Sequence, residues 1–247
     1  QEFLKEISGM DNICLQPAAG AQGELAGMLM IHAYHQSKGI QRKKVLLPDS
    51  AHGTNPASSA LCGYKVVSIP SNSSGFIDLE FLNNTMDDNV AGIMLTNPNT
   101  LGKFEKDIIK ITDIVHKKGG LVYCDGANLN AIMGMAKMGE MGIDVMHFNL
   151  HKTFSTPHGG GGPGAGPVGI KKVLEPFLPI PVIEKQGSGF HLNYNRPKSI
   201  GKLKAFYGNF GILLRAYVYI LSLGRQGIKK ACQMAVLNAN YIRSHLE

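Results

Sequence analysis

Lys152 occupies an unusual position for a lysine. It follows the apolar, strand-like residues 144–150, lies between His151 and Thr153, and stands shortly before the glycine-rich run 158–164. Lysines usually decorate solvated surfaces, but a desolvated amine can lose its proton and attack an aldehyde. The position therefore indicates Schiff-base chemistry of the kind found in pyridoxal phosphate (PLP) enzymes.

Asp125 is the natural companion of such a lysine. It closes an apolar strand-like segment 27 residues before Lys152. A pyridoxal cofactor needs a carboxylate beside its pyridine nitrogen, and Asp125 is suited to that role. We therefore predict that Asp125 and Lys152 act on the same cofactor.

Two further segments could complete the site. The small-residue turn 18–24 opens into a helical pattern over 22–37, and a helix N-terminus offers free N–H groups and a positive dipole end to an anion. Tight helix packing is the alternative use of these small residues. His52 follows the strand-like residues 44–47, where open α/β sheets bind ligands, and its imidazole could stack on a planar ring. A loop histidine bonded only to backbone is the equal alternative.

The elements that must position these residues alternate along the chain. Strands are predicted over 13–17, 44–47, 65–69, 90–96, 120–124, 145–150 and 166–171. Helices are predicted over 3–7, 22–37, from Pro56 onward, over 78–86 after the cap Asp78, and over 104–116 with Phe104 buried. Such alternation predicts a mostly parallel sheet covered by helices on both faces. Thr96, Asn97, Asp125, His151 and Lys152 would then meet at one edge of the sheet.

The last third of the chain is less regular. Extended pieces are expected over 182–185 and 190–194, followed by a buried apolar helix over 205–223 and a final helix over 226–245. The glycines and Arg215 inside 205–223 argue against a membrane span. Helical patterns at both ends lack capping residues, which predicts that the chain is part of a longer protein. No internal domain boundary is indicated.

Composition narrows the function classes. The 247 residues are 44% hydrophobic and 17% charged, with a net charge of +7. The basic residues are scattered and form no run of five, so neither nucleic acid nor membrane is an expected partner. Four cysteines lie far apart without a CxxC pair, which indicates a reducing compartment.

Rival motifs have weaker support. Gly159-x-Gly161-x-x-Gly164 matches a dinucleotide fingerprint but lacks its strand-to-helix context. His147, His151 and His158 could be counted as metal ligands, yet no supporting carboxylate spacing accompanies them, and no metal is predicted. A Ser/His/Asp set lacks a nucleophile-elbow sequence.

Several long motifs, taken in order, resemble the glycine decarboxylase family, the PLP-dependent P-proteins of the glycine cleavage system. They are Ala-Gly-Ala-Gln-Gly-Glu at 19–24, Ser-Ala-His-Gly-Thr-Asn-Pro at 50–56, Asp-Gly-Ala-Asn at 125–128, Asn-Leu-His-Lys-Thr at 149–153, the run 158–164, Arg-Pro-Lys-Ser-Ile-Gly at 196–201 and Ala-Phe-Tyr-Gly-Asn at 205–209. The resemblance runs the whole length. The residues Ala18 and Ala19 before Gly20 resemble the sequence of the second subunit in the bacterial two-subunit form more than that of the fused enzyme.

The resemblance implies a fold-type I PLP large domain over 1–247, with the smaller C-terminal domain largely absent. It implies Schiff-base formation by Lys152, pairing of Asp125 with the pyridine nitrogen and stacking of His52 on the ring. The remaining implied contacts are the phosphate turn Gly20, Ala21 and Gln22, assistance from Thr153 or His151, packing by Ala127, and cofactor or substrate contacts from Asn97 and Thr96.

The implied activity is decarboxylation of glycine, with transfer of the aminomethyl group to the lipoyl group of H-protein. A companion P-protein subunit, in a heterotetramer, is the implied partner, in the cytoplasm of a bacterium or the mitochondrial matrix of a eukaryote. The alternatives are another fold-type I PLP lyase or aminotransferase, or a non-catalytic structural subunit. The intact pair of Asp125 and Lys152 argues against the last, because a scaffold needs neither residue.

Overall fold

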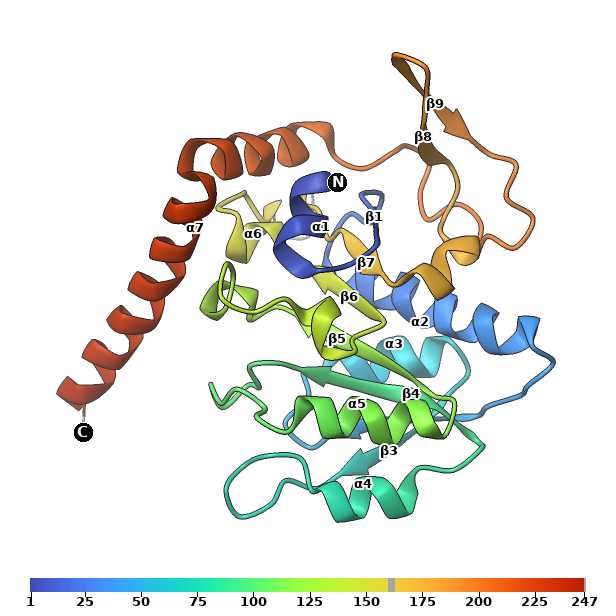
Figure 1. Cartoon of the computed structure of the whole chain (residues 1–247), viewed down its shortest axis with the longest axis vertical. Coiled ribbons are helices and arrows are strands. Elements are labelled where there is room, and N and C mark those ends of the chain that lie inside the picture. Colours follow the sequence, from blue (N-terminus) through green and yellow to red (C-terminus); the bar gives the residue numbers. More distant parts are fainter. Residues whose placement is uncertain (160–162, 247) are drawn as a thin grey trace.

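The strand-like segments assemble into one seven-stranded sheet with helices on both faces (Figure 1). The computed structural model describes residues 1–159 and 163–246. The strands of the sheet are β1 (Asn12–Cys14), β2 (Lys44–Pro48), β3 (Lys65–Ile69), β4 (Val90–Thr96), β5 (Leu121–Gly126), β6 (Val145–Phe148) and β7 (Val168–Ile170). Within the glycine run predicted to follow Lys152, residues 160–162 lie outside this description.

The sheet has the order β1-β7-β6-β5-β4-β2-β3. The five strands from β6 to β3 are mutually parallel, whereas β7 is antiparallel to both β6 and β1. The predicted mostly parallel sheet is thus confirmed. Thr96 pairs with Asp125, and Asp125 pairs with His147, so the carboxyl ends of β4, β5 and β6 are in register.

Alternate residues of the strands enter two separate cores. In β5, Leu121 and Tyr123 pack on one side, and Val122 and Cys124 on the other. A strand buried on both faces must be apolar throughout, which explains the continuous apolar runs seen in the sequence. Asp125 has the same parity as Tyr123, so its carboxylate points toward the Tyr123 side of the sheet.

The α-helices of the described residues are α1 (Glu2–Ser8), α2 (Gly20–Ser37), α3 (Thr54–Leu61), α4 (Leu79–Thr85), α5 (Ile108–Lys117), α6 (Leu150–Thr153) and α7 (Phe210–Leu246). Short 3₁₀ turns are η1 (Leu129–Ala131), η2 (Met138–Met141) and η4 (Lys172–Phe177). Helix α2 lies on the Tyr123 face, and α4 and α5 lie on the opposite face. Asp78 caps α4 by accepting a hydrogen bond from the N–H of Phe81, as predicted.

Helix α2 reaches the sheet closely because glycines face it. A Cβ added at Gly23 would lie 2.7 Å from the carbonyl oxygen of Gly166, and one added at Gly27 would lie 2.6 Å from the Tyr123 ring. Gly20 is equally tight, since its Cβ would meet Asn149 Oδ1 at 2.2 Å. These absent side chains allow the N-terminus of α2 to approach the carboxyl edge of the sheet.

Several predicted boundaries were wrong. Helix α5 begins at Ile108 rather than at residue 104, and Phe104 is 37% exposed, because the N–H of Glu105 bonds to Asn97 and its carboxylate to the N–H of Ile77. The strand over 145–150 ends at Phe148, and the next residues turn into α6. The strand predicted over 13–17 ends at Cys14, and the one predicted over 166–171 covers only Val168–Ile170. Helices α2 and α3 each begin two residues earlier than predicted, at Gly20 and Thr54.

The final part of the chain departs most from expectation. Strands β8 (Val182–Gln186) and β9 (Gly189–Asn193) form a separate hairpin, which confirms the two extended pieces. The predicted buried helix over 205–223 starts only at Phe210 and is largely exposed, with a kink at Gly224 (φ 59°). Its second half stands away from the sheet (Figure 1). Within the described residues, no helix is both long and apolar enough to cross a membrane.

Candidate active site

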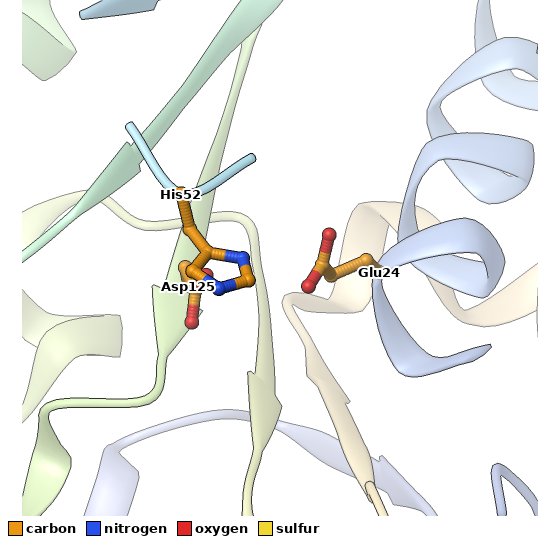
Figure 2. Close-up of side chains that lie close together, drawn as sticks. All are labelled: Glu24, His52 and Asp125. Atoms are coloured by element: carbon orange, nitrogen blue, oxygen red, sulfur yellow. The ribbon is translucent and has the colours of Figure 1, made fainter. Parts of the chain in front are cut away.

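The carboxyl ends of the parallel strands bring the predicted residues to one edge of the sheet. His52 lies in the loop after β2, Asn97 follows β4, Asp125 lies near the end of β5, and Lys152 lies in α6 just after β6. Open α/β sheets bind their ligands at this edge. Figure 2 shows His52 and Asp125 close together, with a third residue, Glu24 of α2, directed toward them.

Asp125 is held as a buried carboxylate with only 2% of its surface exposed. Its Oδ1 accepts a hydrogen bond from the N–H of Ala127 at 2.8 Å, and His147 Nε2 lies 3.4 Å from the same oxygen. Asn55 donates to Oδ2 at 3.3 Å when its amide nitrogen is turned toward the carboxylate, the orientation that avoids opposing two oxygens. Both carboxylate oxygens of Asp125 therefore have a hydrogen-bond donor.

His147 supports Asp125 from the neighbouring strand. Burial lowers the pKa of His147 and raises the pKa of Tyr123 well above its usual value, so we assign a neutral imidazole and a protonated phenol. The Tyr123 hydroxyl lies 2.6 Å from His147 Nδ1. If the hydroxyl donates there, the ring proton is on Nε2, which faces Asp125.

Glu24 is a second buried carboxylate at this edge, with 4% of its surface exposed. Thr54 donates to its Oε1 at 2.8 Å, and Ser58 lies 3.4 Å from Oε2 as a weak donor. Burial raises the pKa of Glu24 to about 7, with Asp125 adding to the shift, while the Thr54 bond and the charge of Lys152 oppose it. Glu24 therefore changes its charge near neutral pH.

His52 is exposed, and its Nδ1 lies 2.7 Å from the hydroxyl oxygen of Thr54. A ligand atom from each of Glu24, His52 and Asp125 lies within 4.8 Å of the others, a grouping that could also hold a cation. Asn55, however, already places a donor between the two carboxylates. Hydrogen bonding therefore satisfies this cluster without a metal.

Lys152 lies in a single helical turn, and its side chain is exposed. Ser155 follows with φ of 54°, a left-handed conformation that is uncommon outside glycine and that turns the chain away after α6. The Oγ1 atom of Thr153 is buried and has no hydrogen-bond partner among the described residues. His151 instead makes an edge-to-face contact with His158, at 4.3 Å between ring centroids, and burial lowers its pKa.

The remaining predicted contacts also lie at the edge. Thr96 Oγ1 and Asn97 Nδ2 are buried without a partner in the described part of the chain. The side chain of Gln22 is already occupied, because it accepts from the N–H of Ala18 and donates to the carbonyl of Leu203. Its backbone N–H, like those of Gly20 and Ala21, lies in the first turn of α2, where N–H groups lack a helical acceptor.

These features fit a phosphorylated pyridoxal cofactor. The first turn of α2 offers N–H groups to a phosphate, and Gly20 lets that turn approach the sheet. Asp125 offers a buried carboxylate to a ring nitrogen, and Lys152 offers an amine. The unpartnered atoms of Thr96, Asn97 and Thr153 are polar groups that a bound molecule could satisfy.

The sequence did not reveal the residues that contact Asp125 and His52 from behind the proposed cofactor-binding residues. Sequence reasoning did not identify Glu24 or Asn55, and it considered His147 only as a metal ligand. One signal was present: Glu24 is a carboxylate four residues after Gly20, on a helix whose other buried residues are apolar or small, apart from His35. The pairing partner of His147 could be read only from the strand register.

The fold is that of the fold-type I PLP-dependent enzymes. More particularly, the chain belongs to the class-V aminotransferase family, whose sequence profile matches residues 23–166. It is 61% identical to a protein of Pseudothermotoga lettingae named "Probable glycine dehydrogenase (decarboxylating) subunit 2", over 99% of this chain and 51% of that protein. A relative of the same name from Pyrococcus furiosus is 57% identical, over 100% of this chain and 50% of the relative.

The solved structures agree on the fold. A glycine decarboxylase (P-protein) of the glycine cleavage system, in inhibitor-bound form, matches with a TM-score of 0.75 at 22% identity, over 93% of this chain and 53% of that one. A glutamate decarboxylase of Lactobacillus brevis matches with a TM-score of 0.69 at 11% identity, over 94% of this chain and 55% of that one. The chain thus spans about half the length of the curated relatives it matches.

Proposed function

We propose that this chain is the cofactor-binding part of a PLP-dependent glycine decarboxylase of the second-subunit type. The carrying observation is the placement of Asp125, His52 and Lys152 at one sheet edge, in a chain 61% identical to a protein named for this activity. In the proposed reaction glycine loses carbon dioxide, and the remaining aminomethyl group passes to one sulfur of a lipoyl disulfide on H-protein, which is reduced.

Pyridoxal phosphate, when bound, supplies an aldehyde carbon that an amine can attack and a pyridine ring that accepts electron density. Asp125 would hold a proton on the ring nitrogen, since its buried carboxylate has no cationic side chain bonded to it among the described residues. His52 would stack on the ring, and Ala127 would pack against the same ring. Gly20, Ala21 and Gln22 would bind the phosphate through backbone N–H groups.

Lys152 would supply the amine that anchors the cofactor, and later hold or release a proton at Nζ. Thr153 is the better candidate for assisting phosphate binding, because its hydroxyl is buried and unpartnered among the described residues, whereas His151 contacts His158. Thr96 and Asn97 would contact the cofactor or the glycine. Water is excluded from Asp125 by its burial, which strengthens each of these electrostatic contacts.

The partners belong to the same proposal. The names of the relatives, as subunit 2, support a companion subunit, and we propose a heterotetramer with it. The net charge of +7 would favour an acidic, lipoyl-bearing H-protein. We further propose that residues 1–247 form one large domain and that a smaller domain completes the pocket in a longer protein.

Borohydride reduction of the chain with PLP tests the central assignment. We expect one pyridoxyl group per chain, located by peptide mass spectrometry on Lys152, and its loss in Lys152→Ala. Lys117→Ala removes an exposed lysine of α5 and should label normally. Labelling of a different lysine in the unmodified chain would contradict the assignment.

Substrate choice separates glycine decarboxylation from another fold-type I lyase or aminotransferase. Glycine should change the visible spectrum of the bound cofactor, while L-glutamate should not. A response to L-glutamate alone would favour the alternative enzymes. Absence of any bound cofactor would favour a structural subunit.

A further inference from the structure

Glu24 is linked by hydrogen bonds to both His52 and Asp125, the two residues proposed to contact the cofactor ring. We do not expect Glu24 itself to contact the ring or the substrate. Its carboxylate is buried on α2, and among the described residues its donors come from the first turns of α3. Thr54 donates to Oε1 at 2.8 Å, and Asn55 donates to Oε2 at 3.0 Å in the orientation assigned above. Two neighbouring residues of one helix thus bind opposite oxygens of a single side chain.

Each of these donors also contacts one ring-binding candidate. The Thr54 hydroxyl oxygen lies 2.7 Å from Nδ1 of His52, and the Asn55 amide donates to Oδ2 of Asp125 at 3.3 Å. Glu24 is therefore one bridging residue away from both the imidazole and the carboxylate. Figure 2 shows its carboxylate directed at the other two side chains, from the opposite side of the site.

We infer that Glu24 is a positioning residue that fixes His52 and Asp125 relative to each other through Thr54 and Asn55. The inference rests on the proposed function, because it gives these two residues a common ligand. A single carboxylate that binds both bridges couples the orientation of the stacking imidazole to that of the ring-nitrogen carboxylate. A carboxylate suits the task because both of its oxygens accept hydrogen bonds.

Substitutions should separate the two hydrogen-bonded paths from Glu24, one through Thr54 to His52 and the other through Asn55 to Asp125. Glu24→Gln keeps the volume but replaces one acceptor oxygen with an NH₂ group, so one of the two bridges must lose its acceptor. Thr54→Val removes only the path to His52, and Thr54→Ser restores a hydroxyl at that position. The charged or titratable groups around Glu24 are Asp125 and Tyr123 from β5, Lys152 from α6 and His52 from the loop before α3.

The test is the circular dichroism of PLP bound to the chain, recorded in its visible band from pH 6 to 9. This signal reports the orientation of the ring in its pocket. We expect Glu24→Gln and Thr54→Val to lower the band intensity at least twofold and to shift its pH midpoint, and Thr54→Ser to restore both. The dissociation constant for PLP should rise about tenfold, the usual cost of a lost hydrogen bond to a charged group.

A matched control is Asp144→Asn. Asp144 is another buried carboxylate, bonded to His116 and the N–H of Val122, but it lies at the opposite end of β6. It should lower the melting temperature without changing the band or its midpoint. If Glu24→Gln does the same, Glu24 is only structural and the inference is wrong.

Two further results keep the test decisive. If Glu24→Gln does not fold, Thr54→Val decides, and a wild-type band in that variant overturns the inference. If the unmodified chain shows no PLP band and no pyridoxyl group on Lys152, the proposed function itself has failed. That outcome also removes the inference, but by a different measurement.

Discussion

At the scale of single residues, the site combines two buried carboxylates in different protonation environments. Donors surround Asp125 on both oxygens, whereas burial raises the pKa of Glu24 to about 7 despite its hydrogen bonds. Two like charges so close are costly when both are ionised. Asn55 reduces that cost by donating to both. The nearby Asp125 adds to the raised pKa of Glu24.

The raised pKa of Glu24 predicts a pH-dependent stability. The folded chain binds this proton more tightly than the unfolded chain, whose glutamates titrate near 4.5. The favourable term is therefore fully present below about pH 4.5, is lost as the pH rises toward 7, and changes no further above that. The shift corresponds to on the order of 3 kcal/mol.

We therefore expect the stability of Glu24→Gln relative to the unmodified chain to rise by up to that amount from pH 5 to pH 8, on top of a pH-independent cost of the lost acceptor. Denaturant unfolding of both cofactor-free proteins at each pH measures the difference, and other titrating groups cancel in the comparison. Parallel stability curves would mean that Glu24 titrates as an ordinary surface glutamate does.

The positions of Lys152 and Asp125 could be predicted because the sequence patterns that mark them are local. Lys152 and Asp125 each follow an apolar run, and a parallel sheet must bring such ends together. The comparison with known proteins confirmed the resemblance to glycine decarboxylase. Glu24, Asn55 and His147 were not predicted to support Asp125, because their contacts join elements far apart in the sequence.

At the scale of elements, prediction succeeded where burial sets the pattern. Strand β4 has the predicted bounds, because a continuous apolar run enclosed by turns leaves little freedom. Strand β3 also has the predicted bounds, although its Lys65 and Ser68 are exposed. Helix α5 was placed too early because residues 104–107 continue a helical pattern but use their polar groups for contacts with Asn97 and Ile77. Helix α7 was wrongly expected to be buried, since hydrophobicity alone does not say what covers a helix.

The glycine face of α2 is the element-scale feature on which the site depends. We expect Gly27→Ala to destabilise the chain by about 1–3 kcal/mol, because the new Cβ would lie 2.6 Å from the Tyr123 ring and 2.9 Å from Val145 Cγ1. Since Tyr123 bonds to His147, the same change should also weaken PLP binding.

Gly211→Ala in α7 is the control, because no atom lies within 4 Å of the Cβ it would add. There alanine should be neutral or stabilising by up to about 1 kcal/mol, through its higher helix propensity. Thermal unfolding measures both variants. Equal melting temperatures for Gly27→Ala and the unmodified chain would show that α2 shifts easily and that its close approach is not required.

At the scale of the whole molecule, the apolar residues divide unequally between the sheet and α7. Strands β4, β5 and β6 are buried along their whole length, but only five of the 37 residues of α7 are buried. Large apolar side chains of its second half are exposed, including Leu237 at 58%, Tyr241 at 64% and Ile242 at 59%. A hollow of about 500 Å³ lies beside its kink at Gly224, and a mainly apolar one of about 410 Å³ lies beside its first half. So extended an apolar surface favours association.

We therefore expect the 247-residue chain to self-associate through α7, by packing this helix against that of a second copy. Replacing Leu237, Tyr241 and Ile242 together with Gln should shift the chain toward monomer, because glutamine keeps helix propensity while removing apolar area. Sedimentation velocity over a hundredfold range of concentration measures the shift. Asn238→Gln and Asn240→Gln, on the same exposed turns, control for the effect of introducing glutamine into α7 without removing apolar area. Because Lys152 and Asp125 lie in the sheet and not on α7, pyridoxyl labelling of Lys152 should be unchanged in the monomeric variant. Concentration-independent sedimentation of the unmodified chain as a monomer would contradict the prediction, and would mean that water covers this helix at little cost.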